Sequence, residues 1–382
     1  MKKLLYILTP LLLIALVYFF WSKNDRVIDT ENIFPRYVIG NVEEFGNKNG
    51  KGNIIALSPY LHTTDFSSQS AFFNMMHYYF SFAKRKKLLN DSTIIVLPEY
   101  IGSWLVTVNE KRSMYADTSL EEGMQTVIVS NLFKFGTSYL ISKSEDKKTE
   151  AVFKMKADKM LEIYQTTFSK LAKEFHVIIV AGSVVLPDPS VKDGKIEINK
   201  SGKLYNISAV FDVSGKVIAP LTKKIYPIEE EKTFTCCADK NTGIPVYKTP
   251  AGNLAVLICA DAWYPQNYNS LKNKNINILA VPSFVSGNDS WIKRWKGYNG
   301  AVMPTDIDKT DIGKITEYEA WKKYSMLGRI QEAGIKTGVN VFLRGELWNL
   351  GTDGHTLIWC NNKVQEPAAP NDKTGSLINV WL

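Results

Sequence analysis

The chain has 382 residues, of which 45% are hydrophobic and 22% charged, and its formal net charge is +8. This composition is that of an ordinary globular protein and excludes disordered, collagen-like and coiled-coil chains. Four cysteines are too few for a disulfide scaffold, four histidines lie far apart, and the basic residues are spread along the chain, so we expect no disulfide framework, no metal site and no nucleic-acid partner.

The amino terminus carries a long uncharged run. Two lysines precede Leu4 to Trp21, eighteen residues without a charge, which as a helix would span roughly 27 Å. Bulky aromatic residues stand where a signal-peptide cleavage site needs small ones, which favours an uncleaved anchor over a cleaved signal. The flanking charges favour a cytoplasmic N-terminus. We therefore predict a single-pass membrane protein with a transmembrane anchor at 1–22, a juxtamembrane linker at 23–36 and a periplasmic or extracellular domain at 37–382.

Beyond the linker, short apolar strands alternate with helical patterns. Strands are predicted at 53–57, 93–97, 176–181, 204–211, 254–259, 276–282, 338–343 and 355–359, and helices at 67–88, 157–175 and 319–333. Several strands are apolar throughout, which is typical of sheets covered by helices and predicts an α/β fold. An insertion-like segment at 104–150 contains an apolar block at 127–141. It is interpretable as a surface helix, a lid over a site or an amphipathic patch on a membrane.

Three predicted strands end in residues that could carry chemistry. Glu99 follows one strand, Lys224 follows a strand and turn, and Cys259 ends a third. Each of the three residues taken alone has a simpler explanation. A buried cysteine more often packs in the core than reacts, and the glutamate and the lysine could be solvated surface charges. Because ligands of α/β sheets bind at the carboxyl ends of strands, the three could also converge. A thiol, a carboxylate and a lysine would then supply a nucleophile, a base and a cation for an oxyanion.

An ordered series of motifs strengthens the second interpretation. The motifs lie at 97–99, 180–183, 204–206, 215–218, 224–231, 249–254, 258–265, 281–283, 328–332 and 354–355. The series resembles the nitrilase superfamily of carbon–nitrogen hydrolases over about 54–359. The resemblance implies a four-layer αββα sandwich that follows the N-terminal transmembrane helix. It also implies that the enzyme needs no metal and no organic cofactor.

The resemblance assigns a catalytic triad. Cys259 is the expected nucleophile, Glu99 the general base and Lys224 the oxyanion-stabilising cation. Lys223 is a competitor, but only Lys224 has the family's spacing to Pro227. We also expect the nearby lysine to favour the thiolate form of the cysteine.

Three supporting residues follow from the same resemblance. Glu231 corresponds to a second glutamate near the site, although Glu229 and Glu230 are adjacent in the sequence. The backbone N–H of Ala260 is the second expected oxyanion donor. Asp261, two residues after the cysteine, follows the amidase-like pattern, which favours amide over nitrile substrates.

The resulting prediction is a hydrolase that cleaves the carbon–nitrogen bond of a small-molecule amide or nitrile through an acyl-thioester on the cysteine. Two alternatives stay open. The first is a membrane-associated N-acyltransferase with the same triad, and the second is an inactive binding module with the same fold. Family members commonly form dimers, so the resemblance also implies a homodimer.

Overall fold

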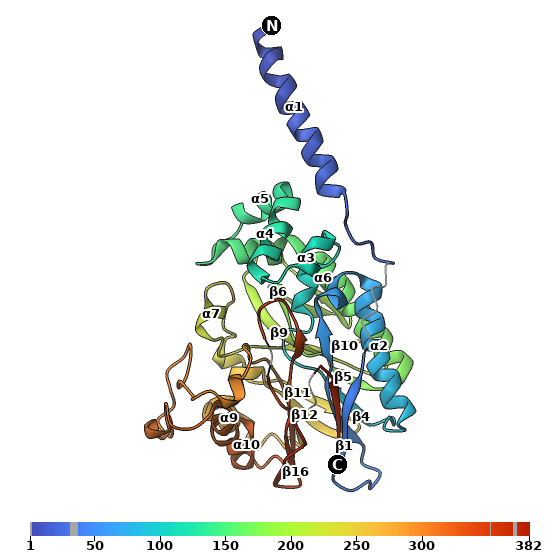
Figure 1. Cartoon of the computed structure of the whole chain (residues 1–382). Coiled ribbons are helices and arrows are strands. Elements are labelled where there is room, and N and C mark those ends of the chain that lie inside the picture. The colour runs from blue at the N-terminus through green and yellow to red at the C-terminus, as the bar shows by residue number, and fades with distance from the viewer. Residues whose placement is uncertain (1, 31–36, 352, 370–372) are drawn as a thin grey trace.

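A computed structural model describes residues 2–30, 37–351, 353–369 and 373–382. Two sheets form its centre (Figure 1). In spatial order the larger sheet contains β1 (Ile39–Phe45), β18 (Gly375–Trp381), β2 (Asn53–Ser58), β4 (Thr93–Val96), β5 (Ile178–Val180), β9 (Leu204–Phe211) and β10 (Val217–Lys223), with β6 (Val184–Pro187) paired to β9. The smaller sheet contains β11 (Val246–Thr249), β12 (Gly252–Val256), β13 (Ile278–Ser283), β14 (Thr337–Phe342), β16 (Leu357–Cys360) and β17 (Lys363–Gln365). Two short pairs join β3 (Tyr60–His62) to β15 (Arg344–Glu346) and β7 (Ser190–Lys192) to β8 (Lys195–Glu197).

The sheets pack face to face because their strands are apolar on both sides. In β2, Ile54 and Ala56 point into a core shared with the smaller sheet, whereas Ile55 and Leu57 point into a second core beneath helices. The helices that cover the larger sheet are α2 (Gln69–Arg85) and α6 (Lys147–Phe175). Those that cover the smaller sheet are α8 (Pro265–Leu271), α9 (Glu317–Tyr324) and α10 (Met326–Arg329). The predicted αββα layering is therefore present.

Two parts of the sequence prediction are wrong in detail. The helix expected at 319–333 is divided into α9, α10 and a 3-10 turn, η7 (Ile330–Ala333), because Ser325 leaves the helical region with φ −102° and ψ −147°. The C-terminal strand β18 was not predicted, yet it lies inside the larger sheet, parallel to β1 and antiparallel to β2.

The insertion forms a helical cap on one end of the sandwich (Figure 1). It consists of η2 (Ser103–Thr107), α3 (Arg112–Ala116), α4 (Leu120–Ser130) and α5 (Leu132–Leu140), and it leads into α6. The apolar block 127–141 is thus not one helix. Asn131 interrupts it, because its backbone leaves the helical region with φ −130° and ψ 30°. Its side-chain amide donates to the Val127 carbonyl and to the Glu110 carboxylate.

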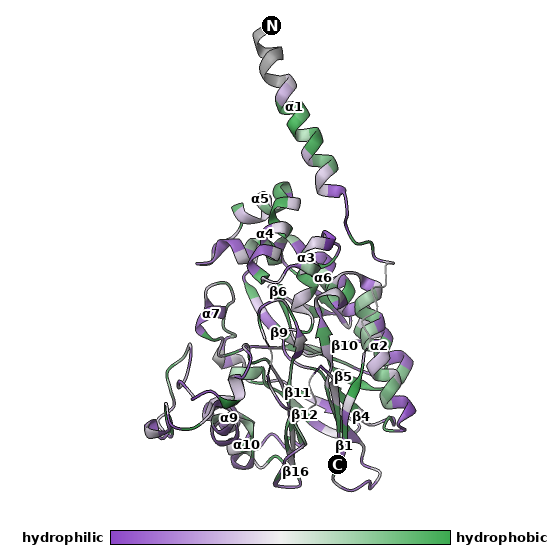
Figure 2. Ribbon diagram, in the orientation of Figure 1, coloured by the Kyte–Doolittle hydropathy of each residue, from purple (hydrophilic) through white to green (hydrophobic). Residues whose placement is uncertain are grey.

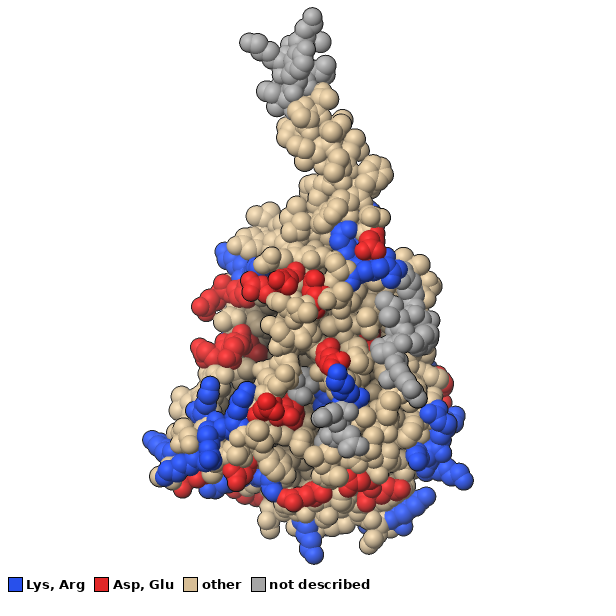
Figure 3. All heavy atoms as spheres, viewed as in Figure 1, with Lys and Arg blue, Asp and Glu red and all other residues tan. Residues whose placement is uncertain are grey.

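Helix α1 (Lys2–Lys23) projects from the cap (Figure 1), and its side chains are described from Thr9 onward. It is apolar along most of this length, and the neighbouring α5 carries further apolar positions (Figure 2). Among the described side chains of α1, the first charge appears at its foot beside the domain (Figure 3). The predicted span Leu4–Trp21 falls in part outside the described side chains. A search of the described residues finds no helix with the length and apolarity of a membrane span, so the predicted anchor is not supported there.

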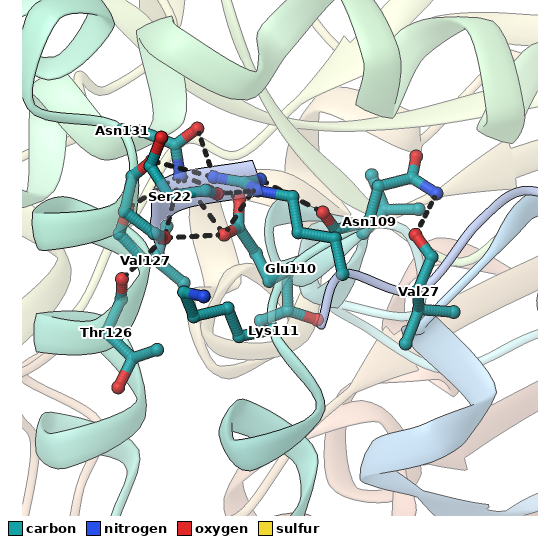
Figure 4. Close-up of polar contacts among 12 residues, drawn as sticks. Ser22, Val27, Asn109, Glu110, Lys111, Thr126, Val127 and Asn131 are labelled. Atoms are coloured by element: carbon teal, nitrogen blue, oxygen red, sulfur yellow. Dashed lines mark hydrogen bonds and ion pairs between the residues drawn. The ribbon is translucent and has the colours of Figure 1, made fainter. Parts of the chain in front are cut away.

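The foot of α1 is tied to the cap by a buried polar network (Figure 4). Arg26 donates to the carbonyls of Ser22, Asn109 and Ser130 and pairs with Glu110 at 3.2 Å. The Glu110 side chain is 0% exposed and also pairs with Lys156 at 2.5 Å. A buried carboxylate is stable only when positive charges compensate it, so Glu110 requires both Arg26 and Lys156. Because Arg26 also donates to Ser22 of α1, the network ties the end of α1 to the cap.

Candidate active site

The three predicted catalytic residues meet at one end of the sandwich. Glu99 follows β4, Lys224 follows β10, and Cys259 opens η4 (Cys259–Trp263) after β12. Their exposed fractions are 1%, 2% and 7%. All three line one cavity of about 790 Å³. The carboxyl ends of strands from both sheets therefore converge on one chamber, as predicted from the sequence.

Lys224 lies between two carboxylates. Its Nζ is 2.8 Å from Glu99 Oε1 and 2.6 Å from Glu231 Oε2. Glu231 lies on α7 (Glu229–Lys232) and is buried, whereas Glu229 and Glu230 are exposed. Glu230 lines the outer part of the same chamber, but it is Glu231 that pairs with Lys224. The two carboxylates therefore hold the ammonium in one orientation.

Two further residues complete the polar cluster. Asn206 of β9 donates from Nδ2 to Glu99 Oε1 at 2.9 Å and to Glu231 Oε1 at 3.3 Å. The Tyr100 hydroxyl donates to Glu231. Neither residue was predicted as part of the site. The available signal for Asn206 was its amide within a mostly apolar strand. The available signal for Tyr100 was its position directly after Glu99.

Burial controls the protonation states in the cluster. It raises the pKa of Glu99, with Lys224 opposing and the charge of Glu231 adding to the effect. Burial alone would lower the pKa of Lys224, but the two carboxylates raise it well above its ordinary value. The lysine therefore stays an ammonium ion throughout the neutral pH range.

The pKa of Cys259 corrects one sequence prediction. Burial and then the charge of Glu99 raise the pKa of the thiol well above its ordinary value, and Lys224 only partly opposes them. The resting nucleophile is thus a neutral thiol and not the thiolate that the nearby lysine alone would favour. A base must remove its proton when it attacks, and the interacting Glu99 carboxylate is placed to do so.

The backbone around Cys259 is strained and held in place. Its φ of 49° lies in the left-handed region, which costs roughly 1–3 kcal/mol for a non-glycine residue. Asp261 secures this turn, because its carboxylate accepts from the backbone N–H groups of Ile225, Tyr226 and Ile258 at 2.7–3.3 Å. The aspartate therefore links the lysine loop to the cysteine turn and acts as a positioning residue.

The other predictions have the following places in the structure. Ala260 lines the chamber next to Cys259, where its predicted oxyanion role requires it. Lys223 lies outside the chamber, with its ammonium 4.2 Å from the centre of the Tyr205 ring.

Among the described residues, no group of three His, Cys, Asp or Glu side chains is arranged to hold a metal ion. The insertion does reach the site, because α4 forms part of the chamber wall.

Comparisons with known proteins agree with this geometry. A family profile described as carbon-nitrogen hydrolase matches residues 93–298. The probable hydrolase YhcX of Bacillus subtilis (strain 168) is 23% identical over 168 residues, which are 44% of this chain and 29% of that protein. The chain thus aligns with less than a third of the length of this relative.

Solved structures share the fold. An amidase from Nesterenkonia sp. has a TM-score of 0.52 and 12% identity, with coverage of 88% of this chain and 93% of the amidase. A mutant of that amidase in complex with butyramide has a TM-score of 0.52 and 13% identity, covering 88% and 94%. Another mutant, with the acetamide moiety of fluoroacetamide covalently added at its active site cysteine, has a TM-score of 0.51 and 13% identity, covering 88% and 93%. At such identities the likeness concerns the fold.

Proposed function

Since this chain belongs to the carbon-nitrogen hydrolase family, we propose that it hydrolyses an amide through an acyl-thioester on Cys259. The observation that carries the proposal is the convergence of Glu99, Lys224 and Cys259 in one chamber, with Lys224 held 2.8 Å from Glu99. The amidase-like Asp261 supports amides over nitriles. So does the fold shared with the Nesterenkonia sp. amidase, a mutant of which has been solved in complex with butyramide.

In the first half-reaction, Glu99 accepts the thiol proton while Cys259 Sγ bonds to the carbonyl carbon. The carbonyl π electrons move to oxygen, where the Lys224 ammonium and the Ala260 N–H stabilise the negative charge. Collapse of this intermediate breaks the carbon–nitrogen bond. The departing amine takes the proton from Glu99 and leaves an acyl-thioester.

In the second half-reaction, Glu99 accepts a proton from water while the water oxygen attacks the thioester carbon. The same two donors stabilise the second oxyanion. Collapse breaks the carbon–sulfur bond, the thiol recovers its proton from Glu99, and a carboxylic acid is released. The raised pKa of Glu99 suits both steps, because a carboxylate of higher pKa is a stronger base when ionised.

Ammonia release from amides and from the matching nitriles tests the proposal. The wild-type chain should release ammonia faster from amides, and Cys259→Ala should abolish the release. Cys360→Ala is the matched control, because Cys360 is also buried but lies on β16 in the core between the sheets. Ammonia release that survives in Cys259→Ala, or that is equally lost in Cys360→Ala, would contradict the assignment.

We further propose that α1 places the enzyme at a membrane, with the domain on the periplasmic or extracellular side. Apolar side chains are exposed at four consecutive positions of α1, from Leu11 to Ile14, so they face all sides of the helix. A protein partner would cover one side, whereas lipid can surround the helix. The full chain should therefore sediment with phosphatidylcholine vesicles, and Leu13→Asp with Val17→Asp should leave it in the supernatant. An equal distribution of both proteins would refute the proposal.

A further inference from the structure

One helix of the insertion exposes an apolar row to the active-site chamber. Leu120, Met124 and Ile128 of α4 are spaced four residues apart, so they form a row along one face of the helix. All three line the chamber that contains Cys259, and all three are only half-buried. The row is therefore open to whatever occupies the chamber.

The packing of α4 on the domain is centred on the neighbouring face. Val127 is 0% exposed and belongs to the core beneath the larger sheet. Gly123 allows close approach, because a Cβ at this position would lie 2.6 Å from the sulfur of Met114. Gly123 and Val127 dock the helix, and Met124 and Ile128 also pack partly against the same core, but the parts of the row that stay accessible face the chamber. Side chains that keep an apolar surface toward a cavity indicate a ligand with an apolar surface.

Adjacent elements extend the apolar wall. Val152 and Phe153 at the start of α6 line the same chamber, and the Phe153 ring stacks on Phe234 with ring centres 5.8 Å apart and an interplanar angle of 4°. These residues and the α4 row come from separate parts of the chain, namely the insertion, the start of α6 and the segment after α7. The chamber of about 790 Å³ therefore combines a catalytic floor with an extended apolar wall.

We propose that the substrate of this site is an amide whose acyl group carries an extended apolar chain, which lies along Leu120, Met124 and Ile128. The inference rests on the proposed amidase function and adds the substrate class. We assign the chain to the acyl side because the acyl group stays on Cys259 through both half-reactions, whereas the amine leaves after the first. A wall that binds the acyl chain thus serves both steps.

A chain-length series measures the effect of the wall on the wild-type enzyme. The kcat/KM for acetamide, butanamide, hexanamide and octanamide should rise about fourfold for each methylene that becomes fully buried. The isomeric series of N-alkylacetamides should show a smaller rise. A flat alkanamide series, or a steeper N-alkylacetamide series, would overturn the inference.

Two charge substitutions on neighbouring residues test the row itself. Met124→Glu places a carboxylate in the chamber, and it should lower the ratio of octanamide to acetamide kcat/KM by about tenfold or more. Gln125→Glu is the matched control, because Gln125 is exposed on the same helix and is not part of the chamber wall. This control should leave the ratio within about twofold of wild type. Equal ratios for the two variants would contradict the assignment.

A protection assay separates this inference from the proposed function. Alkylation of Cys259 by iodoacetamide is followed by peptide mass spectrometry in wild-type protein, with octanamide or acetamide present. Octanamide should protect at a much lower concentration than acetamide. Protection by octanamide without hydrolysis of any amide would sustain the apolar wall and refute the hydrolase. Hydrolysis with equal protection by both amides would refute the apolar wall alone.

Discussion

The buried network at the foot of α1 gives a quantitative prediction for Glu110→Gln. The substitution keeps the size and shape of the side chain but removes the charge that compensates Arg26 and Lys156. Their side chains are only 20% and 11% exposed. Removing one partner of a buried ion pair costs about 3–5 kcal/mol, because the remaining charge is left uncompensated. We therefore expect the free energy of unfolding to fall by about 3 kcal/mol.

A matched surface substitution provides the control. Asp25 pairs with Arg112 at 3.4 Å in the same region, but both side chains are about half exposed, at 53% and 47%. Asp25→Asn is the same carboxylate-to-amide change and should cost less than about 1 kcal/mol. Denaturant unfolding of the full chain, followed by tryptophan fluorescence, measures both values.

The pH dependence of this variant is a second test. Burial lowers the pKa of Lys156 below its ordinary value, so the folded state loses this proton at a lower pH than the unfolded state does. The destabilisation of Glu110→Gln should consequently shrink as the pH rises through the lowered pKa. If Glu110→Gln lowers the free energy of unfolding by less than about 1 kcal/mol at neutral pH, as Asp25→Asn should, then the charges of Arg26 and Lys156 do not depend on Glu110 for compensation and the argument is refuted.

Three further predictions concern the active site. Lys224→Met should lower kcat about 100- to 1000-fold, because it removes an oxyanion-stabilising charge, as steady-state kinetics would show; unchanged kcat would exclude that role. Burial raises the pKa of Asp261 to about 7, so folding takes up a proton, and the free energy of unfolding should fall as the pH rises from about 4 to about 7. Asp261→Asn should flatten this slope, and an unchanged slope in denaturation experiments would contradict it. Tyr100→Phe removes the donor to Glu231 and should cost about 1–3 kcal/mol, measured by denaturation; a neutral effect would mean that this hydrogen bond is unimportant.

The central strands could be predicted from the sequence because their signals are local, whereas the roles of Glu99, Lys224 and Cys259 were assigned by resemblance. Strands such as β2 and β4 are buried throughout and have apolar centres, and Glu99 and Cys259 lie just after such runs. The second glutamate could be selected only by resemblance, since three glutamates are adjacent at 229–231. The structure distinguishes them by burial, which depends on how α7 packs against Lys224.

The features that the sequence did not predict depend on contacts between distant residues. Glu110 meets Arg26 and Lys156 from three separate segments, and no short pattern in the sequence indicates that these charges are buried together. Asn206 stands out as a polar residue in its strand, but its partner Glu99 could be identified only from the structure. The neutral state of the Cys259 thiol likewise follows from burial, which outweighs the nearby lysine.

The central claim is that Cys259 carries the acyl group during turnover. Intact-mass spectrometry of wild-type protein, quenched with acid while it turns over an amide, tests it directly, because the acyl-thioester lies between the two half-reactions. We predict a mass increase equal to the acyl group, mapped by peptide analysis to Cys259 and missing in Cys259→Ala protein. Hydrolysis of the amide with the acyl group on another residue, or hydrolysis that persists in Cys259→Ala protein, would contradict the account.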